Sequence, residues 1–243
     1  RTDTNTLYAG GTRLWKTING GTTWNVCDTV GTAYAIHADH HQTLYHPLSG
    51  HLFDFNDGGV NYSTDEADSW ISRCDGLITH QFYKVAFAKT NPDMVIGGTQ
   101  DVGFFSSTMP QSLTTWSNNF GGDAFGCAID PTDANIWYGH SFLNYRRLKT
   151  INAGMNWSFI NTGTSSGDQW RMPITMHPTN PQILLTSDYV GMYKTVNGGS
   201  LWTVSSATGD IGAYAYDKVN PNLVYASQRN GSIVYRSADG GSS

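Results

Sequence analysis

An eight-residue pattern, Ser/Thr-x-Asp/Asn-x-Gly-x-x-Trp, recurs along this chain and constrains its fold more than any other feature. Its acid or amide falls at positions 19, 65, 152, 197 and 239, so successive copies are 46, 87, 45 and 42 residues apart. The gap of 87 residues corresponds to two periods, and a degenerate copy without Asp or Gly, Thr114-Thr115-Trp116, lies inside it. A steady period of this length indicates a chain built from repeated supersecondary units.

Each copy of the pattern, here named a repeat turn, has the residue types of a tight β-hairpin. The Asp or Asn side chain accepts hydrogen bonds from turn amides, and the Gly takes a positive φ. We expect the Trp, on the following strand, to pack over the hairpin. The pattern is similar to the Asp-box, or BNR, repeat. The residues that we predict to be structural, and not catalytic, are Asn19, Trp24, Asp65, Trp70, Asn152, Trp157, Asn197, Trp202 and Asp239.

A second repeat sets the register of the strands. Apolar segments end in short Pro- or Asn-containing turns at positions 46, 88, 130, 177 and 217, which are 42, 42, 47 and 40 residues apart. Each turn leads to another apolar segment, then to the strand entering a repeat turn, and then to the Trp strand. Four strands in each period of roughly 40 to 45 residues are typical of propeller blades. The sequence therefore predicts an all-β, β-propeller fold with strands A to D numbered from the inside outward.

The repeats also predict where the blades begin and end. We expect one domain over residues 1–243 with approximate blades at 1–31, 32–77, 78–120, 121–163, 164–208 and 209–243. Residues 7–24 supply strands B, C and the start of D, whereas residues 213–237 supply A, B and C. This amounts to about five and a half blades, which we expect to be part of a propeller of seven or more.

Composition argues against several classes of partner. The net charge is -5, and no cluster of Lys and Arg forms the basic stripe that nucleic acid requires. No apolar stretch approaches the roughly 18 residues of a membrane helix, so direct membrane insertion is not expected. The three cysteines form no CxxC pair and are too few for a disulfide scaffold, which favours free thiols. Few Lys and Glu residues, with abundant Trp, Tyr and Asn, favour an extracellular or cell-surface location.

The loops between blades carry the candidate binding residues. In a propeller the D–A and B–C loops share one face, and counting back seven residues from each turn gives equivalent positions 39, 81, 123, 170 and 210. We expect a polar, acid-rich funnel with aromatic walls, suited to a cation, a sugar or a basic peptide. The predicted ligand-binding residues are His37, Asp39, His41, Asp57, Gln81, Tyr83, Gln100, Asp101, Asp123, Asp168, Trp170, Arg171 and Asp210.

These residues have structural explanations as well. Asp in a Gly-rich loop commonly forms a turn, and Tyr or Trp in such loops commonly packs between blades. The segment His37-Ala-Asp39-His40-His41 has metal-ligating residue types on one strand face, but no distant third ligand can be named. We therefore assign no metal and no cofactor, while a cation bound in the funnel stays open.

Two kinds of enzyme can be weighed. Trp170-Arg171-Met172-Pro173 resembles the aromatic-Arg-Ile-Pro motif of sialidases, yet it follows four repeat-turn positions, and no Tyr/Glu nucleophile pair is present. A glycosidase of the xyloglucanase kind would need two carboxylates about 5–10 Å apart. The candidates for such a pair are Asp39, Asp101 and Asp123.

The segment from His37 to Tyr138 resembles a particular group of proteins more closely than the repeat turns alone do. Its motifs appear in this order: His37-Ala-Asp39-His40-His41, Asn56-Asp57-Gly58-Gly59, Gln81-Phe82-Tyr83, Gly98-Thr99-Gln100-Asp101-Val102-Gly103 and Gly121-Gly122-Asp123-Ala124. This order is similar to that of large secreted Asp-box proteins of Bacteroidota-type bacteria, labelled sortilin/Vps10-like or BNR-repeat glycosyl hydrolase. Val102 replaces the family's Asn, and Ala124 its last Gly. The resemblance implies export, with a type IX sorting domain outside these residues, but no particular activity.

The leading hypothesis is a secreted or surface-attached binding or assembly module for a protein or glycan ligand at the D–A/B–C loop face. Its partners would include the rest of a longer chain or a larger surface assembly. One alternative is a glycoside hydrolase that uses paired aspartates on the same face. Another is a structural subunit of an envelope complex that makes contacts through its blade edges.

Overall fold

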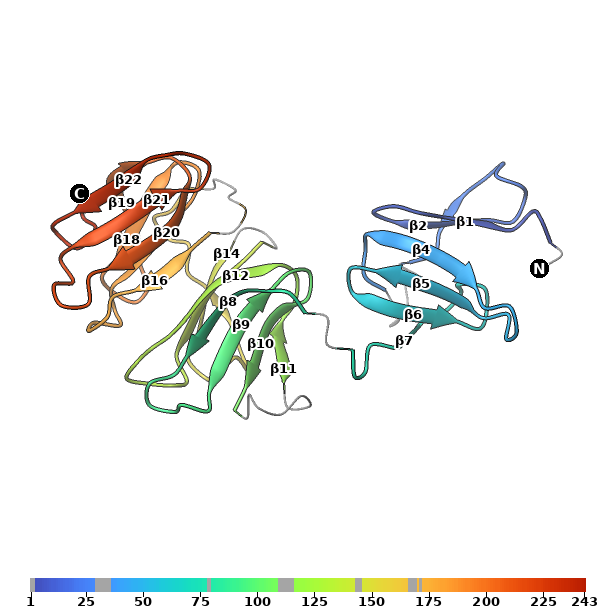
Figure 1. The fold of residues 1–243 in the computed structure, drawn as a ribbon, viewed down its shortest axis with the longest axis horizontal. Coiled ribbons are helices and arrows are strands. Elements are labelled where there is room, and N and C mark those ends of the chain that lie inside the picture. Colours follow the sequence, from blue (N-terminus) through green and yellow to red (C-terminus); the bar gives the residue numbers. More distant parts are fainter. Residues whose placement is uncertain are drawn as a thin grey trace. The chain divides into compact units, whose positions relative to one another are not determined.

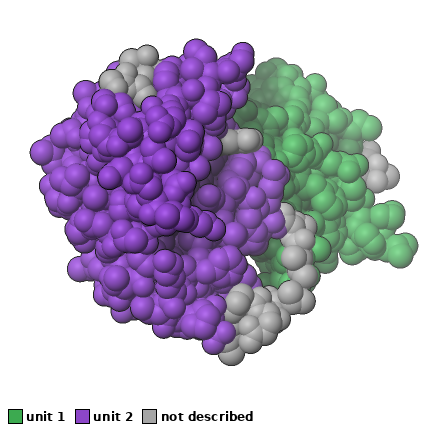
Figure 2. Space-filling view, turned by 60° about the vertical axis from the view of Figure 1, so that its left-hand side comes forward, with its two compact units in different colours: residues 1–79 green, residues 80–243 purple. Residues whose placement is uncertain are grey.

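The computed structural model of this chain is all-β, with no helix in the part of the chain that it describes (Figure 1). The structure describes residues 3–28, 36–77, 80–108, 116–142, 146–165, 170 and 172–243, with the side chains of 206–208 excepted. The chain forms two compact units, residues 1–79 and 80–243, which are coloured separately in Figure 2.

Unit 1 contains two antiparallel sheets. The first has the order β1-β2-β3, and the second the order β4-β5-β6-β7. The strands are β1 Leu7–Gly10, β2 Leu14–Thr17, β3 Asn25–Val26, β4 His40–Tyr45, β5 Leu52–Asn56, β6 Gly59–Ser63 and β7 Ile71–Ser72.

Unit 2 contains four sheets, each formed by consecutive strands: β8 to β11, β12 to β15, β16 to β19, and β20 to β22. The first strands are β8 Phe82–Phe87, β9 Val95–Thr99, β10 Gly103–Ser107, β11 Ser117–Phe120, β12 Ala124–Ile129, β13 Trp137–Ser141, β14 Arg146–Thr150 and β15 Ser158–Phe159. They are followed by β16 Ile174–Met176, β17 Leu184–Ser187, β18 Gly191–Thr195, β19 Thr203–Thr208, β20 Ile211–Tyr216, β21 Val224–Gln228 and β22 Val234–Ser237.

This topology confirms the predicted all-β fold of antiparallel blades. Each sheet is a meander in which sequential strands pair, and the predicted strands B, such as 136–139 and 183–186, lie within a few residues of β13 and β17. The described part of the first sheet begins at strand B, and that of the last ends at strand C. Whether all the blades form one domain stays a prediction.

Each of the five repeat turns has the same pattern of hydrogen bonds. In the copy at 195–202, the Thr195 hydroxyl donates to Asn197 Oδ1 at 2.9 Å and accepts from the Asn197 and Gly199 amides at 3.3 and 3.1 Å. Asn197 Oδ1 also accepts the Leu201 amide at 2.9 Å. The same bonds recur around Thr17, Ser63, Thr150 and Ser237. The predicted positive φ is confirmed at the Gly position, for example 87° at Gly199 and 72° at Ala67.

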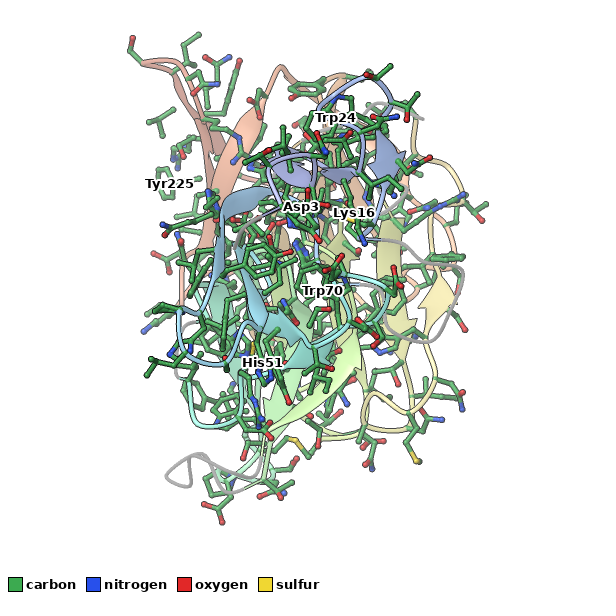
Figure 3. All side chains as sticks on the ribbon, turned by 90° about the vertical axis from the view of Figure 1, so that its right-hand side faces the viewer. Asp3, Lys16, Trp24, His51, Trp70 and Tyr225 are labelled. Atoms are coloured by element: carbon green, nitrogen blue, oxygen red, sulfur yellow. The ribbon has the colours of Figure 1, made fainter. Side chains whose placement is uncertain are left out.

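The Trp of a repeat turn also packs against the preceding sheet, which the sequence analysis did not anticipate. Trp70 Nε1 donates to the Cys27 carbonyl at 2.9 Å, and Trp202 Nε1 donates to the Ile160 carbonyl at 2.6 Å. Trp157 stacks on Phe104 with ring centroids 5.4 Å apart. Trp24, in the first sheet, is 38% exposed (Figure 3 labels Trp24 and Trp70). The apolar clusters accordingly lie between neighbouring sheets within each unit.

The inner strands of unit 2 approach one another closely. A Cβ on Gly98 would lie 2.5 Å from the Ala124 carbonyl oxygen, and one on Gly126 would lie 2.6 Å from the Ile174 amide nitrogen. Only residues without a Cβ allow such backbone contact. These glycines bring β12 against β9 on one side and β16 on the other.

Candidate functional site

The inner strands of unit 2 surround a cavity of about 230 Å³, named here the inner-strand cavity. It is lined by residues 83–84, 125–126, 172–175, 212–214 and Arg229. All but Arg229 lie at or just before the start of an A strand, and Arg229 lies in a B–C loop. The cavity therefore opens at the end of the A strands where the D–A loops arrive, which is where the sequence predicts binding.

A β-bulge occurs near the start of β4, β8, β12 and β20. The unpaired residues are His41 in β4, Tyr83 in β8, Phe125 and Gly126 in β12, and Gly212 in β20. An extra residue in one strand turns its side chain away from the regular alternation. In unit 2 all four of these bulged residues line the inner-strand cavity.

Aromatic side chains form much of the wall and are held in place. Tyr83 and Phe125 have ring centroids 4.9 Å apart, and Trp170 meets Phe125 edge-on at 5.0 Å. The Tyr83 hydroxyl donates to Gln100 Oε1 at 2.9 Å, and the Tyr214 hydroxyl donates to the Thr186 carbonyl at 2.9 Å. Rings fixed at both ends give a wall that needs little ordering when a ligand binds.

Two charged residues are among the described residues that line the cavity, and both are cations. Lys84 is exposed and makes no ion pair within the described part of the chain, while Arg229 Nε donates to Asp210 Oδ1 at 3.1 Å. No carboxylate is among the described residues that line this cavity. The acid-rich funnel predicted from the sequence thus has a cationic inner wall.

A second layer of charge lies behind Phe125. His140, which is fully buried, stacks on Phe125 at 5.5 Å and lies opposite Arg147 in the β13–β14 pair. Burial, and then the positive charges of Arg147 and Arg229, hold the pKa of His140 well below its ordinary value. Arg147 is itself buried, 3.6 Å from the buried carboxylate of Asp188.

The acidic loop residues of unit 2 are held by backbone groups. Asp123 Oδ1 accepts the Asp101 amide at 3.0 Å, which brings two of the catalytic candidates into neighbouring loops. Asp101 has a φ of 65°, an uncommon conformation for a residue with a side chain. The Asp123 carbonyl accepts the Phe142 amide at 2.8 Å, so this loop connects two B–C loops.

The predicted residues of unit 1 lie at the start of β4 and in the loops before β4 and after β5. His41 Nε2 pairs with Asp57 Oδ1 at 2.5 Å, and both residues are exposed. Asp39 has a φ of 62° and donates its amide to the Thr12 carbonyl. His37 is half-buried, with Nδ1 3.0 Å from the Ala38 carbonyl.

A buried network of charged side chains around His40 in unit 1 was not predicted. His40 lies between two carboxylates, with Nδ1 2.7 Å from Asp54 Oδ2 and Nε2 3.3 Å from Asp28 Oδ2. Arg13 makes a two-pronged ion pair with Asp28. An ionised carboxylate only accepts, so both ring nitrogens can donate to their partners only when the ring is protonated. Burial lowers the pKa of His40, but the hydrogen bonds and charges of Asp54 and Asp28 outweigh it and raise the pKa.

The structure brings some of the predicted residues together and separates others by unit. Tyr83 lines the cavity, Trp170 contacts its wall, and Asp210 holds Arg229. Gln81 accepts the Gln100 amide through its carbonyl. Asp39 belongs to unit 1, whereas Asp101 and Asp123 belong to unit 2. Asp168 and Arg171 lie outside the described residues.

Tyr83 is the one described lining residue that was predicted to bind a ligand, and the lining residues that were not predicted include Lys84, Phe125 and Tyr214. Counting two to four residues beyond the aligned loop positions 81, 123 and 210 reaches these three. The signal was therefore present in the repeat register.

Within the described ranges, no three His, Cys, Asp or Glu residues are grouped as metal ligands. The same ranges contain no helix that is long and apolar enough to cross a membrane.

No family model matches this chain, and the curated proteins contain no match either. Among solved structures, the extracellular domain of BT4673 from B. thetaiotaomicron matches 99% of this chain and 32% of its own, at 13% identity and a TM-score of 0.51. YCF48 bound to D1 peptide matches 98% of this chain and 76% of its own, at 18% identity and a TM-score of 0.47. The GH74 xyloglucanase from Xanthomonas campestris matches 98% of this chain and 49% of its own, at 12% identity and a TM-score of 0.44.

This chain spans about half the length of the two GH74 structures that it matches. At these identities the likeness concerns the fold alone. Together with the six antiparallel sheets, it shows that the chain has a propeller-type all-β fold.

Proposed function

We propose that this chain is a binding module of a secreted or cell-surface protein, with a glycan or protein ligand at the D–A/B–C loop face of unit 2. We also propose that the chain is related to the Asp-box, sortilin-like proteins, as the motifs between His37 and Tyr138 imply. The ligand would enter the inner-strand cavity, and neighbouring parts of a longer chain or surface assembly would present it.

The inner-strand cavity supports this proposal more than any other feature. Pockets with mainly apolar and aromatic walls and a few fixed polar groups are typical of ligand sites. Tyr83, Phe125 and Tyr214 supply the rings, and Lys84 and Arg229 supply the charge. A hydrolase would need two carboxylates facing its substrate, and the described lining has none.

One observation favours the glycoside hydrolase as a second candidate. The hydrogen bond from the Asp101 amide to Asp123 Oδ1 brings two carboxyl-bearing residues together at the loops of unit 2. Asp101 is also in a strained backbone conformation, which is common at functional sites. Both residues are half-buried, so neither is withdrawn from solvent.

A panel of plant and bacterial polysaccharides, with soluble acidic and basic peptides, tests both candidates. Binding would be measured by affinity electrophoresis or titration, and hydrolysis by the release of reducing ends. We expect binding without release, lost in Tyr83→Ala and kept in Lys89→Ala, a variant on the opposite face. Release of reducing ends that Asp123→Asn abolishes would instead establish the hydrolase.

A further inference from the structure

We propose that the inner-strand cavity binds a single acidic sugar residue, whose carboxylate lies against Lys84 and Arg229 and whose ring lies on the aromatic wall. This inference rests on the proposed binding function and specifies its ligand. The size of the cavity, the charge of its lining and the hydrogen-bonding groups of its strands support it.

The size of the cavity limits the ligand to one ring-sized group. Its volume of about 230 Å³ lies below the roughly 300–1,000 Å³ of pockets for drug-sized molecules. The missing Cβ atoms of Gly98 and Gly126 let the inner strands approach one another closely. A longer chain could therefore place only one unit inside, with the remainder over the loops.

The charge of the lining selects an anion. Lys84 makes no ion pair within the described residues, and Arg229 is oriented by Asp210. Two nearby carboxylates are paired with cations, Asp188 with Arg147 and Asp210 with Arg229, and Asp123 accepts the Asp101 amide. The buried Arg147 behind Phe125 is paired with Asp188 at 3.6 Å, so the unpaired positive charge of the described lining is that of Lys84. An anionic group would thus be attracted in a protein whose net charge is -5.

The walls favour a sugar. β8, β12, β16 and β20 are the edge strands of their sheets, so they offer unpaired amides and carbonyls together. A ring with several hydroxyl groups can use both kinds of group. Phe125 and Ile174 lie buried behind the wall, so its accessible apolar part includes Pro173 and the half-buried rings of Tyr83 and Tyr214. Such amphipathic surfaces suit the C–H face of a pyranose.

Isothermal titration of the 243-residue chain with trigalacturonate tests the proposal, with fully methyl-esterified trigalacturonate as the matched neutral probe. We expect the acid to bind at least about tenfold more tightly than the ester. Lys84→Met and Arg229→Gln should each remove most of this tenfold preference for the acid. The control variants Lys89→Met and Arg236→Gln should keep it. Raising the NaCl concentration from about 20 to about 500 mM should weaken the binding of trigalacturonate and leave the binding of its methyl ester unchanged.

The other outcomes separate the two proposals. Equal binding of acid and ester, or binding of neutral oligosaccharides alone, would overturn the acidic-sugar inference and leave the binding function standing. An acidic peptide that competes at the same site and binds more tightly than trigalacturonate would also overturn it. If no glycan or peptide binds, both proposals fail. Because Lys84 is exposed, Lys84→Met should fold even if Arg229→Gln does not.

Discussion

At the scale of single residues, one hydroxyl organises each repeat turn. The Thr195 hydroxyl is buried and makes one donated and two accepted hydrogen bonds, while Asn197 extends the network by one more amide. Buried amides that lose their acceptor keep their full desolvation cost. The hydroxyl therefore matters more to the turn than the charge of its neighbour, since Asn and Asp both occur there.

Removing this hydroxyl should destabilise the turn. We expect Thr195→Val, which keeps the shape of the side chain, to lower the free energy of unfolding by about 2 kcal/mol, because the buried Gly199 amide and the partly buried Asn197 amide lose their acceptor. Urea denaturation monitored by tryptophan fluorescence measures this change. Thr195→Ser keeps the hydroxyl and should cost less than half as much. Equal losses in the two variants would contradict this account of the turn.

The buried His40 should make the stability of unit 1 depend on pH. The raised pKa of His40 gives a contribution that is complete below its unfolded pKa of about 6.5 and is lost as pH rises through the folded pKa. Burial raises the pKa of Asp28, but its bonds to Arg13 and the Leu14 amide outweigh this and lower it. That contribution is complete above about pH 3.9 and is lost as pH falls through the folded pKa.

Hydrogen exchange of the β4–β6 amides, corrected for intrinsic rates, tests this pH dependence. We expect greatest protection between about pH 4 and 6.5, with a decline above that range. His40→Gln should flatten the decline, whereas His41→Gln, at the exposed ring paired with Asp57, should leave it in place. A decline that survives unchanged in His40→Gln would assign the dependence to another group.

At the scale of elements, tryptophans and glycines set how neighbouring sheets meet. Trp202 packs against the preceding sheet and donates to a main-chain carbonyl, and Trp70 does the same in unit 1. Trp157 makes ring contacts instead, and its Nε1 has no partner among the described residues. Nearer the centre of unit 2, Gly98 and Gly126 permit backbone contact. In unit 2, neighbouring sheets thus meet in two ways: through tryptophan side chains, and through direct backbone contact at glycines.

Substitution by Phe should lower the free energy of unfolding more at Trp202 than at Trp157. Trp202→Phe removes a hydrogen bond, leaves the Ile160 carbonyl unpaired and opens a cavity, so we expect a loss of about 3 kcal/mol. Trp157→Phe has no such hydrogen bond to lose and should cost roughly 1 kcal/mol less. Thermal and urea unfolding of the two variants would measure the difference. A larger loss for Trp157→Phe would show that ring stacking outweighs the hydrogen bond.

At the scale of the whole molecule, the sequence predicted the all-β fold and the order of its strands. The repeat turns at 19, 65, 152, 197 and 239 set the order of the strands, because Asp, Gly and Trp each have a local role that spacing reveals. The cavity depends on bulges at Tyr83 and Phe125, and a bulge arises from pairing between strands. Such an irregularity leaves no trace in the alternation of one strand.

The buried network around His40 in unit 1 likewise could not be predicted from the sequence. Sequence alone places His40 in a segment with metal-ligating residue types, and it gives no sign that Asp28 and Asp54 lie on either side of the ring. These residues come from three different segments, so only the tertiary structure pairs them. Loop positions could be aligned by counting, whereas the direction of a side chain could not.

Binding at the loop face of unit 2 is the central claim, and hydrogen exchange with and without the tightest-binding polysaccharide of the panel tests it most directly. We expect the ligand to protect peptides covering residues 81–84, 100–102, 123–126 and 210–214, around the inner-strand cavity. The A–B turns at 88–94, 130–136 and 217–223 should exchange at the same rate in both states. Protection confined to those turns would contradict the claim.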